Sequence, residues 1–156
     1  MIKICLVDDH ELLLRGLAMI IDAQTDFEVM HTYGAGQEIL DFLATNPSID
    51  LLMLDVNLPD MEPEDLLSKI REINPSLPII YLTILRGSRV FHRLEKFSFQ
   101  GYLLKDTSYE ELFEAIRVVN GGGTYYSKSI EFDFAKDQSI QENGYVTKSA
   151  GGVLSR

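Results

Sequence analysis

The chain alternates short apolar runs with helical patterns, five times in succession. The apolar runs cover residues 2–7, 27–33, 50–54, 77–82 and 100–104. After the first run, apolar residues recur at the spacing of one helical face, namely Leu12, Leu13, Leu17, Ile20 and Ile21. Similar patterns follow the other runs. Because strand–helix alternation with right-handed crossovers favours a parallel sheet, we expect an α/β fold, doubly wound, with five strands and helices on both faces.

Helix signals lie between the runs. Helices are expected over residues 11–23, 36–45, 63–73 and 88–97. Pro63 and the acids after it suit the first turn of the third helix. Thr107 is expected to cap a fifth helix, with Glu110 completing a capping box, and the glycines at 121–123 end it.

The composition excludes several classes of protein. Of the 156 residues, 46% are hydrophobic, which is enough for a core, and 14 basic against 24 acidic residues give a net charge of −10. Such a charge repels phosphates, so this chain alone is expected to bind DNA poorly. The single cysteine, Cys5, lies in an apolar run and is expected to be buried. No run approaches the roughly 20 apolar residues of a membrane span, so we expect a cytoplasmic protein that does not contact membranes.

The amino-acid composition and the hydrophobic periodicity change after residue 123. Residues 124–130 are compatible with a short extended piece, and residues 131–149 are polar with little periodicity. We therefore expect one domain over residues 1–123 and a linker or tail over residues 124–156.

Polar residues follow four of the five predicted strands. Asp8 and Asp9 come after the first run, Asp55 after the third, Thr83 after the fourth and Lys105 after the fifth. Open parallel sheets bind ligands beyond the carboxyl ends of their strands, so these side chains are expected to meet in one acidic pocket with a cation on its rim. Each residue alone is more often a turn, cap or surface residue, but the joint pattern is hard to obtain by chance.

This set of residues suits phosphoryl transfer. Oxygen ligands in an acidic pocket favour Mg²⁺, and the chain shows no histidine or cysteine cluster for zinc. Asp55 is the candidate nucleophile, since an aspartate can form an aspartyl phosphate. Lys105 and Thr83 can donate to phosphoryl oxygens. His10 is expected to be a polar residue at a helix start, with a role in phosphoryl relay as the alternative.

The motifs LVDDH at 6–10, LLMLDVNLPDM at 51–61, IIYLT at 79–83 and GYLLKD at 101–106 resemble the receiver domain of two-component response regulators. The resemblance implies a flavodoxin-like fold with strand order 2-1-3-4-5. It also implies that Asp55 accepts a phosphoryl group from the phosphohistidine of a sensor histidine kinase. Mg²⁺, or Mn²⁺, would be held by Asp9, Asp55 and the backbone carbonyl of Asn57, with Asp8 acting through a water.

The same resemblance assigns a switch. Thr83 and Lys105 would hold the phosphoryl oxygens, and Tyr102 matches the aromatic residue that turns inward when the threonine moves. Ile84 departs from the family pattern, which has a small residue there. We expect its branched side chain to slow phosphoryl entry and the attack of water.

A narrower similarity is to the NarL/FixJ subgroup, through DDHELLLRGL at 8–17 and the segment at 101–127. Those proteins carry a LuxR-type helix-turn-helix domain, so this chain is expected to be part of a DNA-binding transcription regulator that contacts DNA through a domain missing here and dimerises on phosphorylation. Two alternatives remain open at this point. One is a stand-alone or phosphorylation-independent interaction module. The other is a haloacid-dehalogenase-type phosphatase, although its nucleophile would end the first strand.

Overall fold

The apolar runs of the sequence form a single parallel sheet in the computed structural model, which describes residues 1–84 and 89–127. The strands are β1 (Ile2–Val7), β2 (Phe27–Tyr33), β3 (Leu51–Asp55), β4 (Ile79–Thr83), β5 (Gly101–Leu104) and β6 (Tyr125–Tyr126). Their order is β2-β1-β3-β4-β5-β6, so the predicted 2-1-3-4-5 order holds for the first five.

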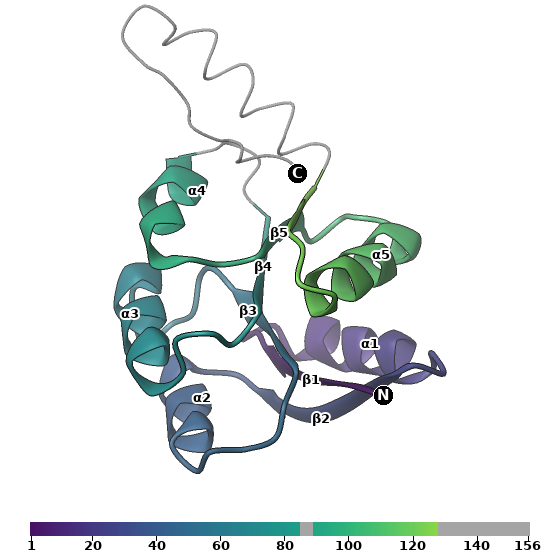
Figure 1. Ribbon diagram of the computed structural model, residues 1–156, viewed down its shortest axis with the longest axis horizontal. Helices are drawn as coiled ribbons and strands as arrows, with labels where there is room; N and C mark the ends of the chain where they lie inside the picture. Colours follow the sequence, from purple (N-terminus) through teal and green to yellow (C-terminus); the bar gives the residue numbers. More distant parts are fainter. Residues whose placement is uncertain (85–88, 128–156) are drawn as a thin grey trace, which may run out of the picture.

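Two helical layers enclose the sheet (Figure 1). The helices are α1 (Glu11–Asp22), α2 (Gly36–Leu43), α3 (Pro63–Ile73), α4 (Arg89–Leu94), the 3₁₀ turn η1 (Glu95–Phe97) and α5 (Tyr109–Asn120). Helices α1 and α5 cover one face, and α2, α3 and α4 cover the other. None of the helices in the described residues has the length and apolar character needed to cross a membrane.

The core divides into two parts because strand side chains alternate between the faces of the sheet. In β3, Leu52 and Leu54 pack toward α2, α3 and α4, whereas Leu51 and Met53 pack toward α1 and α5. All five residues of β3 are buried, which is typical of a central strand covered on both faces. This packing on both faces fixes the position of Asp55, the last residue of β3, at the carboxyl end of the sheet.

The structure corrects several sequence expectations. Leu12, which was placed on the apolar face of the first helix, is 86% exposed. The sheet has six strands rather than five, because β6 pairs with β5 at residues 125–126, within the segment that was expected to be compatible with a short extended piece of the linker. The N-cap of α5 is Ser108 and not Thr107, since Ser108 Oγ accepts from the N–H of Glu111 at 3.1 Å. Thr107 instead donates to the Glu111 carboxylate at 2.6 Å. Strand β4 ends at Thr83, one residue later than predicted.

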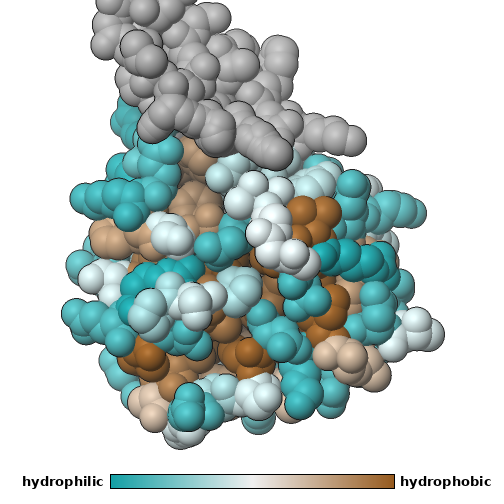
Figure 2. All heavy atoms as spheres, in the orientation of Figure 1, coloured by the Kyte–Doolittle hydropathy of each residue, from teal (hydrophilic) through white to brown (hydrophobic). Residues whose placement is uncertain are grey.

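Two long-range contacts hold helices in place. Asp60, in the loop after β3, accepts from the N–H groups of Gly36 and Gln37 at 2.8 and 2.9 Å and so caps α2 from outside that helix. A methyl group added at Gly36 would lie 2.9 Å from Met61 Cγ, so the close approach of this loop suits glycine. On the face shown in Figure 2, hydrophilic residues surround separate apolar patches.

Candidate functional site

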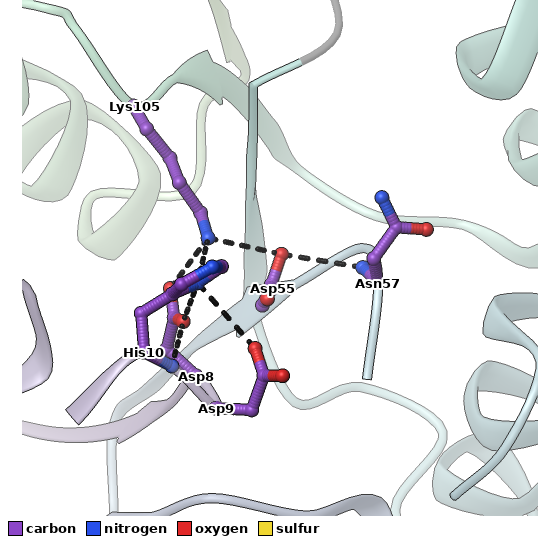
Figure 3. Close-up of polar contacts among 6 residues, drawn as sticks. All are labelled: Asp8, Asp9, His10, Asp55, Asn57 and Lys105. Carbon is purple, nitrogen blue, oxygen red and sulfur yellow. Dashed lines mark hydrogen bonds and ion pairs between the residues drawn. The ribbon is translucent and has the colours of Figure 1, made fainter. Parts of the chain in front are cut away.

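The carboxyl ends of β1, β3 and β5 bring three charged residues together (Figure 3). Lys105 Nζ lies 2.8 Å from Asp8 Oδ2 and 3.3 Å from Asp55 Oδ1. The side chains of Asp8, Asp55 and Lys105 are only 1%, 3% and 8% exposed. A lysine 97 residues from Asp8 in sequence therefore bridges two buried carboxylates, as the strand-end pattern predicted.

Asp55 has an environment that disfavours its charge. The pKa of Asp55 is raised from 3.8 to about 6, first by burial and then by the neighbouring Asp8, against the opposite effects of Lys105 and the N–H of Asn57. One carboxylate oxygen, Oδ1, accepts from the N–H of Asn57 at 3.2 Å. The other, Oδ2, is buried without a hydrogen-bond partner. A buried unpaired oxygen of this kind is suited to a cation or an incoming electrophile.

The acid pair leaves β1 in two different environments. Asp8 is buried, and its Oδ1 accepts from the N–H of His10 at 2.8 Å. Asp9 is more open, with its side chain 37% exposed. The ring of His10 lies over both, with Nδ1 at 3.0 Å from Asp8 Oδ1 and 3.4 Å from Asp9 Oδ1. The sequence favoured His10 as a polar residue at a helix start over a role in phosphoryl relay, although its position directly after the acid pair signalled this proximity.

The donor set fits a divalent cation. Ligand atoms of Asp8, Asp9, His10 and Asp55 all lie within 4.8 Å of one another, and three of the four residues supply carboxylate oxygens. Hard cations such as Mg²⁺ take oxygen ligands, which agrees with the acidic pocket expected from the sequence. Asn57 lies beside Asp55 with its side chain turned away from the carboxylates (Figure 3). The assignment of its backbone carbonyl as a ligand stays a prediction.

Thr83 and Tyr102 lie behind the charged residues. Thr83 is 1% exposed and ends β4, and its carbonyl accepts from the N–H of Lys105 at 2.8 Å. Tyr102 in β5 is fully buried, so its ring points inward. Burial raises the pKa of Tyr102, and the nearby Thr83 side chain lowers it in part. The two residues assigned to the switch are thus neighbours.

Aromatic contacts connect Tyr102 to α4 and β6. The ring of Phe91 in α4 lies 5.3 Å from that of Tyr102 and 5.1 Å from that of Tyr126 in β6, both nearly perpendicular. Tyr81 in β4 and Phe99 contact Tyr102 at 6.3 and 5.9 Å between centroids. Edge-to-face pairs of this kind are favourable and geometrically specific.

Ile84 lines a pocket together with Thr83, Leu104, Lys105 and Asp106. The residue is 67% exposed, so most of its surface is in contact with solvent. The expected effect of Ile84 on phosphoryl transfer stays a prediction.

Two curated relatives are similar over most of the chain. The nitrate/nitrite response regulator protein NarP of Escherichia coli K12 is 34% identical over 128 residues, which cover 82% of this chain and 59% of NarP. The oxygen regulatory protein NreC of Staphylococcus epidermidis is 34% identical over 124 residues, covering 79% of this chain and 56% of NreC. The chain therefore spans less than two thirds of the length of either relative.

Solved structures share the fold. A two-component response regulator of the LuxR family from Aurantimonas sp. SI85-9A1 superposes with a TM-score of 0.81 at 23% identity, over 88% of this chain and 97% of that one. RcsB from Salmonella enterica serovar Typhimurium, bound to a promoter with the phosphomimetic BeF₃⁻, gives 0.80 at 19% identity, over 90% and 70%. The profile of the response regulator receiver domain matches residues 4–117. Taken with the pocket at the strand ends, this match shows that the chain belongs to the response regulator receiver domain family.

Proposed function

We propose that Asp55 accepts a phosphoryl group from the phosphohistidine of a sensor histidine kinase in a reaction that depends on Mg²⁺ or Mn²⁺. One observation carries the proposal: Asp55 is a buried carboxylate with an unpaired oxygen, 3.3 Å from Lys105 and beside two further aspartates. Members of this family are signalling proteins, and phosphorylation on aspartate is typical of them.

The residues divide the chemistry between them. An Asp55 carboxylate oxygen forms the new bond to phosphorus while the bond from phosphorus to the histidine nitrogen of the kinase breaks, and that nitrogen keeps the electron pair. Lys105, already held at the mouth of the pocket by Asp8, offers its ammonium group to an equatorial phosphoryl oxygen. Asp9, Asp55 and the carbonyl of Asn57 would hold a divalent cation, with Asp8 acting through a water, and that cation would neutralise charge on the transferring group.

The same site is proposed to control a switch. Thr83 would donate its hydroxyl to the phosphoryl group, and Tyr102 would report that change to α4 and β6 through Phe91. Support comes from the adjacency of Thr83 and Tyr102 and from the ring contacts of Tyr102. We also propose that Ile84 slows entry and hydrolysis, which is tested by Ile84→Ala. Unchanged rates of phosphorylation and dephosphorylation in that variant would show that Ile84 does not slow either reaction.

Control of transcription is proposed from the similarity to known regulators. NarP is a nitrate/nitrite response regulator and NreC an oxygen regulatory protein, and the RcsB structure has promoter DNA bound. By extension, we propose that this receiver controls transcription in the cytoplasm through a DNA-binding domain. Dimerisation on phosphorylation belongs to the same proposal, with the kinase and a second copy as partners and no role at a membrane.

A mass measurement tests the central claim. The chain is incubated with Mg²⁺ and a small phosphodonor, and intact mass should increase by one phosphoryl group. Asp55→Asn should abolish the gain, whereas Asp41→Asn, a change at an exposed acid of α2, should not. Loss of the gain on removing Mg²⁺ with a chelator is also expected. Equal labelling of Asp55→Asn and wild type would overturn the assignment and favour the interaction-module alternative.

A further inference from the structure

The side chain of His10 does not cap the helix that His10 begins. His10 is the N-cap residue of α1, with φ −87° and ψ 96°, but its side chain makes no capping hydrogen bond. N-cap side chains normally accept from the N–H groups of the first helical turn. The imidazole instead turns back over the acid pair (Figure 3). The helix start therefore does not explain the orientation of the ring.

The ring nitrogen joins a set of atoms that already points to a cation. Nδ1 of His10 belongs to the group of ligand atoms, with those of Asp8, Asp9 and Asp55, that lie within 4.8 Å of one another. The unpaired, buried Oδ2 of Asp55 is an independent sign that this pocket takes a ligand. Lys105 Nζ lies 3.4 Å from the same ring nitrogen, so Nδ1 faces a positive charge in the structure.

Carboxylate oxygen and imidazole nitrogen select different ions. Mg²⁺ takes oxygen ligands and keeps several waters, whereas Co²⁺, Ni²⁺ and Zn²⁺ bind imidazole well. We propose that His10 is an additional ligand of the cation site, used by transition ions that accept nitrogen and not used by Mg²⁺. The inference rests on the proposed function, since it concerns the same pocket. The His10 side chain is 62% exposed, so the ring has room to reorient toward an ion.

Binding of two probe ions tests the proposal on the full chain. Calorimetric titrations with Co²⁺ and with Mg²⁺ compare wild type, His10→Ala and His10→Asn, with His92→Ala as the matched control at a histidine outside the pocket. We expect both His10 variants to bind Co²⁺ about tenfold more weakly and to bind Mg²⁺ within about twofold of wild type. Asn is a favourable N-cap residue, so a loss shared by both variants does not come from weakening of the helix start.

A spectroscopic measurement separates ligation from an indirect effect. In protein labelled with ¹⁵N-histidine, Zn²⁺ should shift the resonance of the His10 ring nitrogen, and Mg²⁺ should leave that nitrogen unligated. Unchanged Co²⁺ affinity in both His10 variants would overturn the proposal. Tighter binding of both ions would also overturn it, because the ring would then compete with the ion. If wild type bound neither ion, the proposed function itself would fail, whereas equal binding by all variants would remove only the role of His10.

Discussion

Asp55 is a residue whose ionisation opposes folding. Its pKa is raised to about 6 in the folded protein, mainly by burial, against 3.8 for the free side chain. The folded state therefore holds this proton more tightly than the unfolded state does, and the contribution of Asp55 to the free energy of unfolding becomes more favourable as the pH falls from about 7 through 6 toward 4. A site that destabilises the fold until a ligand arrives is common at functional positions.

Replacing Asp55 by Asn should stabilise the protein at neutral pH. The raised pKa corresponds to a cost on the order of 2 kcal/mol for the ionised carboxylate. In the presence of a chelator, Asp55→Asn should be more stable than wild type by about that amount at pH 7.5 and nearly equal to it at pH 4. Urea unfolding at both pH values measures this. An equal gain at pH 4 and pH 7.5 would show that the charge of Asp55 is not the cause.

At the scale of single elements, Arg71 joins three segments. From α3, its guanidinium donates to the carbonyls of Asn74 at 3.2 Å, Leu77 at 2.8 Å and Ser98 at 2.6 Å, with a longer contact to Phe97 at 3.4 Å. Burial lowers the pKa of Arg71, and every hydrogen bond named here goes to a backbone carbonyl. Ser98 has a positive φ of 68°, and Arg71 holds that turn in place.

Arg71→Met should weaken the attachment of η1 to α3. Hydrogen bonds to charged groups contribute about 1.5–3 kcal/mol, so we expect a loss of about 2 kcal/mol in the free energy of unfolding. Lys69→Met, at an exposed position of the same helix, should cost far less. Denaturant melts give the stabilities, and amide exchange at residues 97–100 should rise in Arg71→Met alone. A variant with unchanged exchange there would contradict this role.

The external cap of α2 gives a second prediction at this scale. Because the N–H groups of Gln37 and Gly36 lower the pKa of Asp60, its stabilisation is present near neutral pH and is lost as the pH falls through that lowered pKa. Asp60→Ala should cost about 1 kcal/mol at pH 7 and less at pH 3. Asp65→Ala, in the first turn of α3, is the comparison variant. A penalty that did not shrink in acid would indicate that the charge of Asp60 contributes nothing to the cap.

For the whole molecule, the sequence predicted the part of the site that strand topology determines. Asp8, Asp55, Thr83 and Lys105 each follow an apolar run, and parallel pairing alone places such residues at one edge. Strands β1 and β2 were predicted with their observed bounds, since their apolar runs end at polar turns.

Other features depend on contacts between distant residues and leave no local pattern. The capping role of Asp60 and the bonds of Arg71 join positions more than 20 residues apart. The two-residue strand β6 is too short to show a period, and only its pairing with β5 defines it. The ring of His10 turns toward the acids instead of the helix, and its residue type alone did not indicate that direction.

The net charge of −10 applies to the whole chain and leads to a further prediction. Phosphates of DNA should be repelled, and phosphorylation adds more negative charge. We expect the 156-residue chain to leave the fluorescence anisotropy of a labelled DNA duplex unchanged at low salt, with or without the phosphodonor. A rise in anisotropy that disappears as salt is added would contradict this expectation.

The two-residue strand β6 has a mechanical consequence. Ser127, the residue directly after β6, is buried. The N–H of Ser127 donates to the carbonyl of Tyr102 at 2.8 Å. Since β6 runs parallel to β5, Ser127 lies toward the same edge as Asp55. A pull on the chain beyond Ser127 would therefore reach the backbone of Tyr102, which is also the residue proposed to respond to phosphorylation of Asp55.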